Sequence, residues 1–231
     1  MKRVLLTGAS GDIGSAIIRR LSQLEYSVIG LDIVEPQKKG DVECFFKVDL
    51  RRSDEIEGVC REICQSYPHI WGIVCCAGVY PIKSLHDYTL ELWDEVHAVN
   101  LRSAFQISQL LYSNIVKGGR IVIIASGAAH IGSRDVGYST SKAGALGLVR
   151  SLAKSLAPHG ILVNAVNPGV IGTQMSARMS TESVRQYIES IPLKRIGVPD
   201  EVSICVSFLL DEQNSYMTGA SLDVNGGLYT R

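Results

Sequence analysis

The sequence has little of several features that mark particular classes of protein. Lys and Arg together number 23, as do Asp and Glu, so the formal net charge is zero. This balance leaves no basic field for a nucleic-acid backbone or an anionic membrane surface, and we expect neither as a partner. No apolar run approaches the roughly 20 residues that span a bilayer. The first apolar run stops after Leu6, whereas a secretory signal would continue it, so we expect a cytoplasmic protein.

The cysteines are not arranged as in a metal site. Cys60 and Cys64 lie one helical turn apart, and Cys75 and Cys76 end an apolar run. Zinc would need two well-spaced pairs in loops, or neighbouring histidines. We therefore expect no metal site and reduced, mostly buried thiols.

What is present is an alternation of short apolar runs and longer amphipathic stretches over 231 residues, without repeats or a linker. It predicts one dinucleotide-binding and catalytic domain over 1–231, with α/β architecture: a doubly wound, Rossmann-type, mostly parallel seven-stranded sheet with helices on both faces. Strands are expected at 3–6, 27–31, 44–48, 70–75, 120–125, 162–166 and 221–224. Helices are expected at about 12–24, 53–66, 89–116, 137–157 and 199–210. The polar segment 174–196, between two Pro-containing turns, is expected to be a mobile helical flap.

The clearest cofactor signal lies where the first expected strand meets the first helix. Small residues there let the backbone approach a pyrophosphate, and a helix N-terminus offers free N–H groups. The residues of this loop expected to contact a dinucleotide are Gly8, Ser10, Gly11, Asp12, Ile13 and Gly14. The alternative is a glycine-rich turn without a ligand.

An acidic residue, Asp32, ends the second expected strand. Its carboxylate would accept hydrogen bonds from the ribose hydroxyls of NAD and repel the 2′-phosphate of NADP. We therefore expect NAD as cofactor and NADP as the less favoured one, although Lys38 and Lys39 downstream weaken this argument. Alternatively, Asp32 caps a turn.

Tyr138 and Lys142 are four residues apart and share one face of an expected helix. A free phenol has a pKa near 10, and a neighbouring ammonium together with a nicotinamide cation favours the phenolate. A general acid/base needs such tuning. Taken alone, this spacing is more often structural.

Taken in order along the chain, these motifs resemble the compact, single-domain branch of the short-chain dehydrogenase/reductase family over essentially the full length. The further matching stretches are Asp49-Leu50, Ala77-Gly78, Asn100, Ser126, 167–173 (NPGVIGT), 195–202, 216–219 and 225–227. The resemblance implies that Tyr138 exchanges a proton with the substrate oxygen and that Ser126 hydrogen-bonds this oxygen. It further implies that Lys142 holds the nicotinamide ribose and that Asn100 supports a water beside Lys142.

The resemblance also implies which residues surround the rest of the cofactor. They are Asp49 and Leu50 at the adenine, Ala77 and Gly78 along its ribose, and Pro168, Ile171 and Thr173 toward the nicotinamide and its carboxamide. Plainer alternatives stay open for three residues. Ser126 is also suited to a strand-end turn, Asn100 to satisfying buried backbone groups, and Thr173 to capping the flap helix.

Two departures from the family pattern bear on the site. Asp12 replaces the usual middle glycine of the loop, and we expect its carboxylate to face solvent and act on the helix N-terminus. Cys75 and Cys76 replace two asparagines whose amides brace the central strand, so that support must come from elsewhere.

The expected function is hydride transfer between a nicotinamide cofactor and a small-molecule secondary alcohol or ketone. One alternative is an extended-type epimerase or dehydratase, which would carry a further substrate domain, whereas this chain ends at Arg231 soon after its last expected strand. Another is a non-catalytic NAD-sensing scaffold. We also expect a homotetramer, or else a homodimer, packed through the small outward positions Ala104, Gly144 and Gly147.

Overall fold

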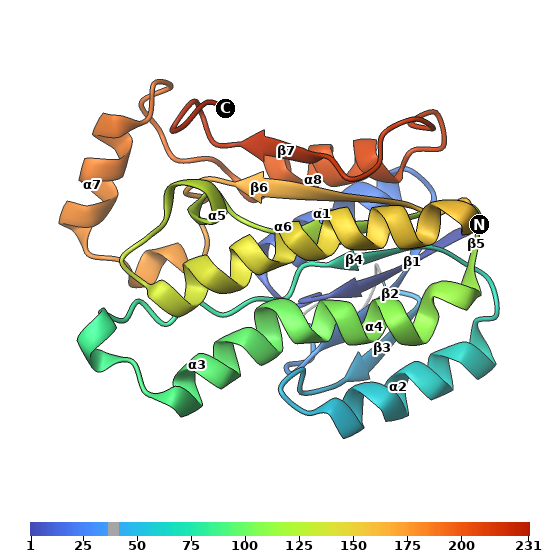
Figure 1. The fold of residues 1–231 in the computed structure, drawn as a ribbon. Helices are drawn as coiled ribbons and strands as arrows, with labels where there is room; N and C mark the ends of the chain where they lie inside the picture. Colours follow the sequence, from blue (N-terminus) through green and yellow to red (C-terminus); the bar gives the residue numbers. More distant parts are fainter. Residues whose placement is uncertain (37–41) are drawn as a thin grey trace.

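Seven parallel strands form one sheet with helices on both faces in the computed structural model, which describes residues 1–36 and 42–231 (Figure 1). The strands are β1 Lys2–Thr7, β2 Tyr26–Asp32, β3 Cys44–Lys47, β4 Ile70–Cys75, β5 Ile115–Ile124, β6 Leu162–Pro168 and β7 Ser221–Val224. The predicted doubly wound sheet is therefore confirmed. Lys38 and Lys39 lie outside the described residues.

The strand order places a binding crevice beside β1. Along the sheet the order is β3-β2-β1-β4-β5-β6-β7, so the chain builds outward from β1 to β3 and then returns to the other side of β1. In open α/β sheets, ligands bind outside the carboxyl ends of the strands at such a reversal. The loops that follow β1 and β4 meet there.

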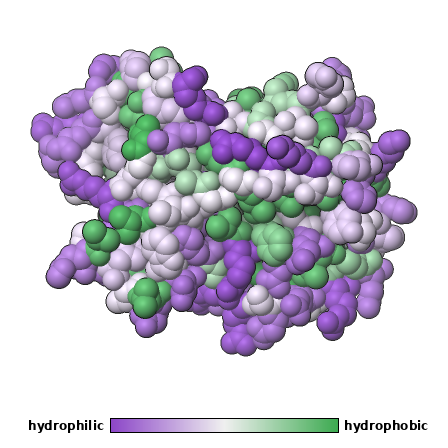
Figure 2. Space-filling view, in the orientation of Figure 1, coloured by the Kyte–Doolittle hydropathy of each residue, from purple (hydrophilic) through white to green (hydrophobic). Residues whose placement is uncertain are grey.

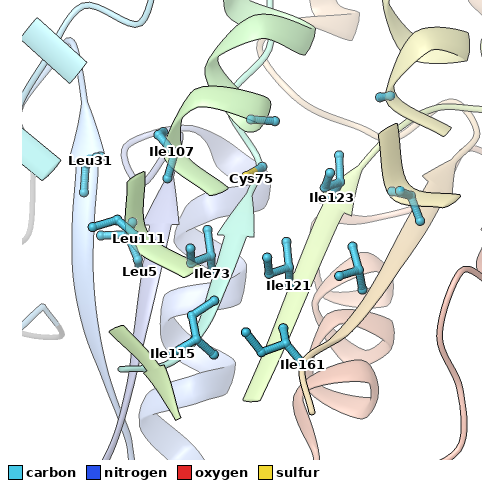
Figure 3. Packing of buried hydrophobic residues seen from close by; sticks show 14 of the residues in the cluster. Leu5, Leu31, Ile73, Cys75, Ile107, Leu111, Ile115, Ile121, Ile123 and Ile161 are labelled. Atoms are coloured by element: carbon cyan, nitrogen blue, oxygen red, sulfur yellow. The ribbon is translucent and has the colours of Figure 1, made fainter. Parts of the chain in front are cut away.

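Two helical layers cover the sheet, because residues that alternate along each strand point to opposite faces. Leu5, Ile73 and Ile121 face the layer seen in front in Figure 1, whereas Val4 and Val74 face the layer behind. Figure 3 shows Ile107 and Leu111 of one front helix packed over Leu5 and Ile73. The front helices are α2 Ser53–Ser66, α4 Ser103–Leu111 and α6 Val136–Leu156, and the rear helices are α1 Asp12–Gln23 and α8 Pro199–Leu210. These apolar layers make the carboxyl edge of the sheet a rigid base for the loops.

The helical segment predicted at about 89–116 is observed over 90–114, but it is not one regular helix. The structure has α3 Leu90–His97, a wider π-helical turn Ala98–Arg102 and then α4, while residue 115 already belongs to β5. A π turn inserts one extra residue into the helical spacing and is common at functional sites. Asn100 lies in this turn and is 3% exposed. The irregularity turns this polar side chain inward.

Short helices border the crevice at the carboxyl edge. They are α5 Ala128–Ile131, the one-turn helices Leu85–Asp87 and Ser176–Arg178, and α7 Thr181–Ser190, which stands apart at the left of Figure 1. The expected flap is thus helical, and none of the residues in its helices is buried. Ile191, which follows α7, is 1% exposed and anchors its end. The mobility of the flap stays a prediction.

Candidate active site

The glycine loop after β1 is closely packed backbone. Gly8 has φ +71°, and its N–H donates to the carbonyl of Leu31 at 2.9 Å. A Cβ atom at Gly14 would lie 2.0 Å from the carbonyl oxygen of Gly8. No side chain larger than hydrogen therefore fits where the first turn of α1 crosses the loop. This small-residue turn, which opens a helix at the sheet reversal, fits the pyrophosphate of a dinucleotide.

Asp32 braces this loop. Its Oδ2 accepts a hydrogen bond from the Ser10 N–H at 3.0 Å, and its Oδ1 accepts one from the Val34 N–H at 3.2 Å. The Ser10 hydroxyl donates to the Val34 carbonyl at 2.5 Å. The turn-capping alternative is therefore observed, and a role toward a ribose would be additional to it.

The sequence predicted that the Asp12 carboxylate faces solvent, but in the structure it also bonds a remote part of the chain. Its Oδ2 accepts a hydrogen bond from the backbone N–H of Gln174 at 2.6 Å. The carboxylate at the first turn of α1 therefore links the glycine loop to the start of the flap. The expectation was wrong because Gln174 is remote in sequence from the loop.

Thr7 supplies the support that Cys75 and Cys76 cannot give. Its hydroxyl oxygen accepts hydrogen bonds from the backbone N–H groups of Cys76 and Ala77, both at 3.1 Å. Thr7 pairs with Cys75 across the β1–β4 ladder and is 2% exposed. No role for Thr7 was predicted from the sequence. The feature that could have indicated one is its position at the end of β1, in register with the cysteines.

Ser126, Tyr138 and Lys142 come together at the carboxyl end of β5. Ser126 follows this strand, and Tyr138 and Lys142 lie on successive turns of α6. The Lys142 Nζ donates to the Ile124 carbonyl at 2.8 Å and lies 5.9 Å from the centre of the Tyr138 ring. The Ser126 side chain lies near enough to Tyr138 to lower the pKa of its phenol. The structure thus groups the three side chains that the sequence singled out.

The net effect of the protein's own groups is to raise the pKa of Tyr138. Burial raises this pKa, the Ser126 side chain lowers it, and the carboxylate of Asp135 raises it further, with a net increase. Burial also lowers the pKa of Lys142 to about 8, because an ammonium loses hydration inside the protein. The lowering of the phenol pKa predicted from the Tyr138–Lys142 spacing is therefore not a property of these side chains alone.

The low pKa of Lys142 predicts a measurable dependence of stability on pH. Unfolded Lys keeps its proton up to about pH 10.4, whereas folded Lys142 loses it above about pH 8. Unfolding between these values takes up a proton, so this contribution to stability increases as the pH rises. The unfolding free energy of the wild type minus that of Lys142→Met should increase across this window by about 3 kcal/mol. Chemical denaturation at several pH values measures it, and a constant difference would contradict the shift.

Asn100 uses its amide on the protein itself. Its Oδ1 accepts from the Val79 N–H at 2.8 Å, and its Nδ2 donates to the Val79 carbonyl and the Ser141 hydroxyl, each at 3.0 Å. The alternative that Asn100 satisfies buried backbone groups is therefore observed. A Cβ atom on Gly78 would lie 3.4 Å from both Asn100 Oδ1 and Lys142 Nζ, so these groups surround one point.

The remaining predicted cofactor residues lie at or after the carboxyl ends of β3 and β6. Asp49 accepts hydrogen bonds from the Arg51 side chain, which lowers the pKa of its carboxyl, and Leu50 is buried. On the other side, the Pro168 carbonyl accepts from the Gly127 N–H at 2.8 Å, and Ile171 is buried. Thr173 exchanges hydrogen bonds with Ser176, the first residue of the one-turn helix Ser176–Arg178.

Tyr80 lies beside Tyr138, whereas His130 does not. The ring centre of Tyr80 is 4.6 Å from that of Tyr138, so Tyr80 borders the reacting phenol. His130 instead packs its ring on Tyr229 at 5.4 Å and contacts Asn167. Of these two side chains, Tyr80 is the one that packs on Tyr138.

Comparison with known proteins decides the family. The family model described as enoyl-(acyl carrier protein) reductase matches residues 8–229. A 3-oxoacyl-[acyl-carrier-protein] reductase of Buchnera aphidicola subsp. Schizaphis graminum is 34% identical, with 99% of this chain and 97% of the relative covered. A short chain dehydrogenase family protein from Francisella tularensis superimposes with a TM-score of 0.91 at 29% identity, with 99% and 98% of the two chains covered. The chain belongs to the short-chain dehydrogenase/reductase family.

Other relatives show the range of substrates within this likeness. An NAD-dependent glycerol dehydrogenase of Listeria innocua is 33% identical, with 98% of this chain and 93% of the relative covered. An aldohexose dehydrogenase of Thermoplasma acidophilum superimposes with a TM-score of 0.90 at 29% identity, with 98% and 93% covered. This short-chain dehydrogenase/reductase is accordingly an oxidoreductase that uses a nicotinamide cofactor to transfer hydride between alcohols and ketones. Among its described residues, no helix combines the length and apolarity that crossing a bilayer requires.

Proposed function

We propose that this enzyme interconverts a secondary alcohol and its ketone with Tyr138 as general acid/base. The observation that carries the proposal is the grouping of Tyr138, Ser126 and Lys142 at the carboxyl edge of the sheet, beside the glycine loop. A bound nicotinamide supplies the hydride in reduction and accepts it in oxidation. The three side chains provide the proton for the substrate oxygen, a hydrogen bond to this oxygen and a positive charge nearby.

Each of the three side chains has one task in this proposal. In reduction, the Tyr138 hydroxyl gives its proton to the substrate oxygen as the carbonyl carbon gains hydride, and the Ser126 hydroxyl donates a hydrogen bond to the same oxygen. In oxidation, the Tyr138 phenolate takes the alcohol proton. The ammonium of Lys142 and the charge of the oxidised cofactor favour this phenolate, against the burial and the Asp135 carboxylate that raise the pKa of Tyr138.

The rest of the crevice is proposed to hold the dinucleotide. The backbone of Gly8, Ser10, Gly11, Ile13 and Gly14 would meet the pyrophosphate, because it lies at the N-terminus of α1. Asp49, Leu50, Ala77 and Gly78 would border the adenosine. Pro168, Ile171 and Thr173 would face the nicotinamide, with the Asn100 amide supporting the segment that carries Val79.

NAD is proposed as the preferred cofactor. The carboxylate of Asp32 stands at the end of β2, beside the glycine loop, where it would meet the adenosine ribose. The name of the Listeria relative, an NAD-dependent dehydrogenase, is consistent with this preference.

Two variants at Asp32 test the preference by separating its charge from its hydrogen bonds. The wild type should have a higher kcat/KM with NADH than with NADPH. Asp32→Asn keeps an acceptor oxygen for the Ser10 N–H but removes the charge, so the ratio should fall by about tenfold, the equivalent of about 1.4 kcal/mol. Asp32→Ala should also weaken the loop and raise KM for both cofactors. A wild-type ratio that favours NADPH would overturn the proposal.

The substrate is tested with a panel of cyclic alcohols, sugars and 3-hydroxyacyl thioesters, each supplied with NAD. Net accumulation of NADH with any of them supports the dehydrogenase. An epimerase would regenerate its cofactor, so product formation without net NADH would favour that alternative. Binding of NAD with no conversion across the panel would favour a sensing scaffold.

Assembly through α4 and α6 is also proposed, as a homotetramer or a homodimer of single-domain chains. Figure 2 shows apolar groups gathered over these helices, where Gly147 and Phe105 are exposed. Ala104 was expected to point outward, but it is 3% exposed and belongs to the core. Light scattering of the purified protein measures the mass, and a monomer would contradict assembly.

All six thiols are free, which is consistent with the expected cytoplasmic location.

A further inference from the structure

Asp135 is a buried carboxylate that the mechanism above uses only as an opposing charge. It is 1% exposed and caps the N-terminus of α6, where its Oδ1 accepts a hydrogen bond from the backbone N–H of Tyr138 at 2.9 Å. The same oxygen accepts the Tyr88 hydroxyl at 2.6 Å. Its Oδ2 accepts the Lys83 backbone N–H at 3.0 Å. One side chain thus joins the catalytic helix to the segment 79–88 at two points.

This segment is built to reach Asp135. A Cβ atom at Gly137 would lie 2.4 Å from the Tyr88 hydroxyl oxygen, so only glycine lets Tyr88 approach the carboxylate. Tyr80, earlier in the segment, packs its ring on Tyr138 with 4.6 Å between the ring centres. The segment that holds Asp135 therefore also flanks the proposed acid/base.

All hydrogen-bond partners of the Asp135 carboxylate among the described residues are donors, and none is a cationic side chain. Two are backbone N–H groups and one is a phenol. Within residues 1–36 and 42–231, no ion pair includes Asp135. A neutral N-cap such as Ser would satisfy the helix end equally well. The additional bonds to Lys83 and Tyr88 are what a carboxylate with two acceptor oxygens provides.

We propose that Asp135 is a positioning residue for hydride transfer, which ties the first turn of α6 to the segment 79–88 and so holds Tyr138 against Ser126. The proposal rests on the role of Tyr138 given above. A hydroxyl displaced by even a fraction of an ångström from the reacting oxygen transfers its proton less well, so loss of the tie should lower kcat more than it alters cofactor binding.

The tie also has an electrostatic consequence. The groups facing the Tyr138 phenol are Ser126 from the end of β5, Tyr80 from the segment 79–88, and Lys142 and Asp135 on α6 itself. The carboxylate of Asp135 opposes the phenolate and raises the pKa of Tyr138. Removal of its charge should therefore make Tyr138 easier to ionise, while removal of its hydrogen bonds should make Tyr138 less well placed.

The test separates the charge from the hydrogen bonds. Asp135→Asn removes the charge and turns an N–H group toward the Lys83 N–H, so kcat should fall by about tenfold while the acid limb of alcohol oxidation moves by about half a pH unit or more to lower pH. Tyr88→Phe keeps the charge and removes one bond, so kcat should fall by about threefold with an unmoved acid limb. The matched control is Asp87→Asn, an exposed carboxylate of the same segment, which should behave as the wild type.

A titration of tyrosinate absorbance makes the test independent of turnover. The Tyr138 signal is the difference between each protein and the same protein carrying Tyr138→Phe, and it should appear at lower pH with Asp135→Asn. If the wild type oxidises no alcohol, the proposed function fails and this titration still answers the question about Asp135. An unmoved titration in folded Asp135→Asn overturns the inference. If that variant does not fold, Tyr88→Phe decides, and a wild-type kcat there overturns it.

Discussion

Turnover should fall by about 10²-fold or more when Tyr138 is replaced by Phe, because the substrate oxygen loses its proton donor and acceptor. The ring and its contact with Tyr80 remain, so the shape of the crevice is retained. The glycine loop does not depend on the phenol, and the affinity for NADH should therefore stay within a few-fold of the wild type. Steady-state kinetics and calorimetric titration with NADH measure the two quantities.

A neighbouring phenol provides the matched control for this substitution. Tyr80→Phe removes the same atom from a ring whose centre is 4.6 Å away, and it should lower kcat by less than about tenfold, as expected for one hydrogen-bonding group. Thermal denaturation should show both variants folded. Near-normal activity of Tyr138→Phe would remove this residue from its assigned role, and equal losses in both variants would indicate a general disturbance of the pocket.

The sequence predicted the sheet well because buried parallel strands are short, nearly continuous apolar runs. The strand at Ile70–Cys75 was predicted with its observed bounds, and the helix at Pro199–Leu210 likewise. The strand β5 begins at Ile115, earlier than predicted. Its start was missed because its first residues include two glycines and precede a shift in register against β4. Such residues carry no apolar periodicity.

The irregular parts could not be predicted from local pattern. The π turn Ala98–Arg102 changes the helical spacing by one residue, which the apolar periodicity of 89–116 does not reveal. The bonds of Asp12 to Gln174 and of Thr7 to Cys76 join residues far apart in the chain. The side chains proposed for catalysis could be singled out because they lie in local motifs, whereas the side chains that hold these motifs in place depend on the tertiary fold.

The pKa directions also show why position and charge must be considered together at Tyr138. Burial excludes water from the phenol and from Lys142, which raises one pKa and lowers the other, so both shifts favour the neutral forms. The proton affinities of the phenol and the amine, nearly equal in water, are thus moved apart, and the phenol holds its proton more tightly than the amine. In the proposed mechanism, the positive charge of the oxidised cofactor therefore has to supply the change toward the phenolate during alcohol oxidation.

Gly14→Ala should nearly abolish dinucleotide binding, with an affinity loss of about 10²-fold or more, equivalent to about 2.7 kcal/mol. The added Cβ atom would lie 2.0 Å from the Gly8 carbonyl oxygen, so the loop or α1 must move. Gly8 cannot retreat, because a Cβ atom there would already lie 2.8 Å from the Ala77 backbone and its N–H is bonded to Leu31. The strain should also lower the unfolding free energy by about 1–3 kcal/mol.

Gly58→Ala is the control, since it adds the same methyl group to an exposed position of α2, outside the proposed binding loop. Its Cβ atom would meet nothing within 4 Å. Its affinity for NADH should therefore stay within about threefold of the wild type, about 0.7 kcal/mol. Calorimetric titration with NADH and chemical denaturation distinguish the two variants. If Gly14→Ala bound NADH as the wild type does, the close packing of this loop would not be what places its N–H groups, and the crevice beside β1 would lose its proposed ligand.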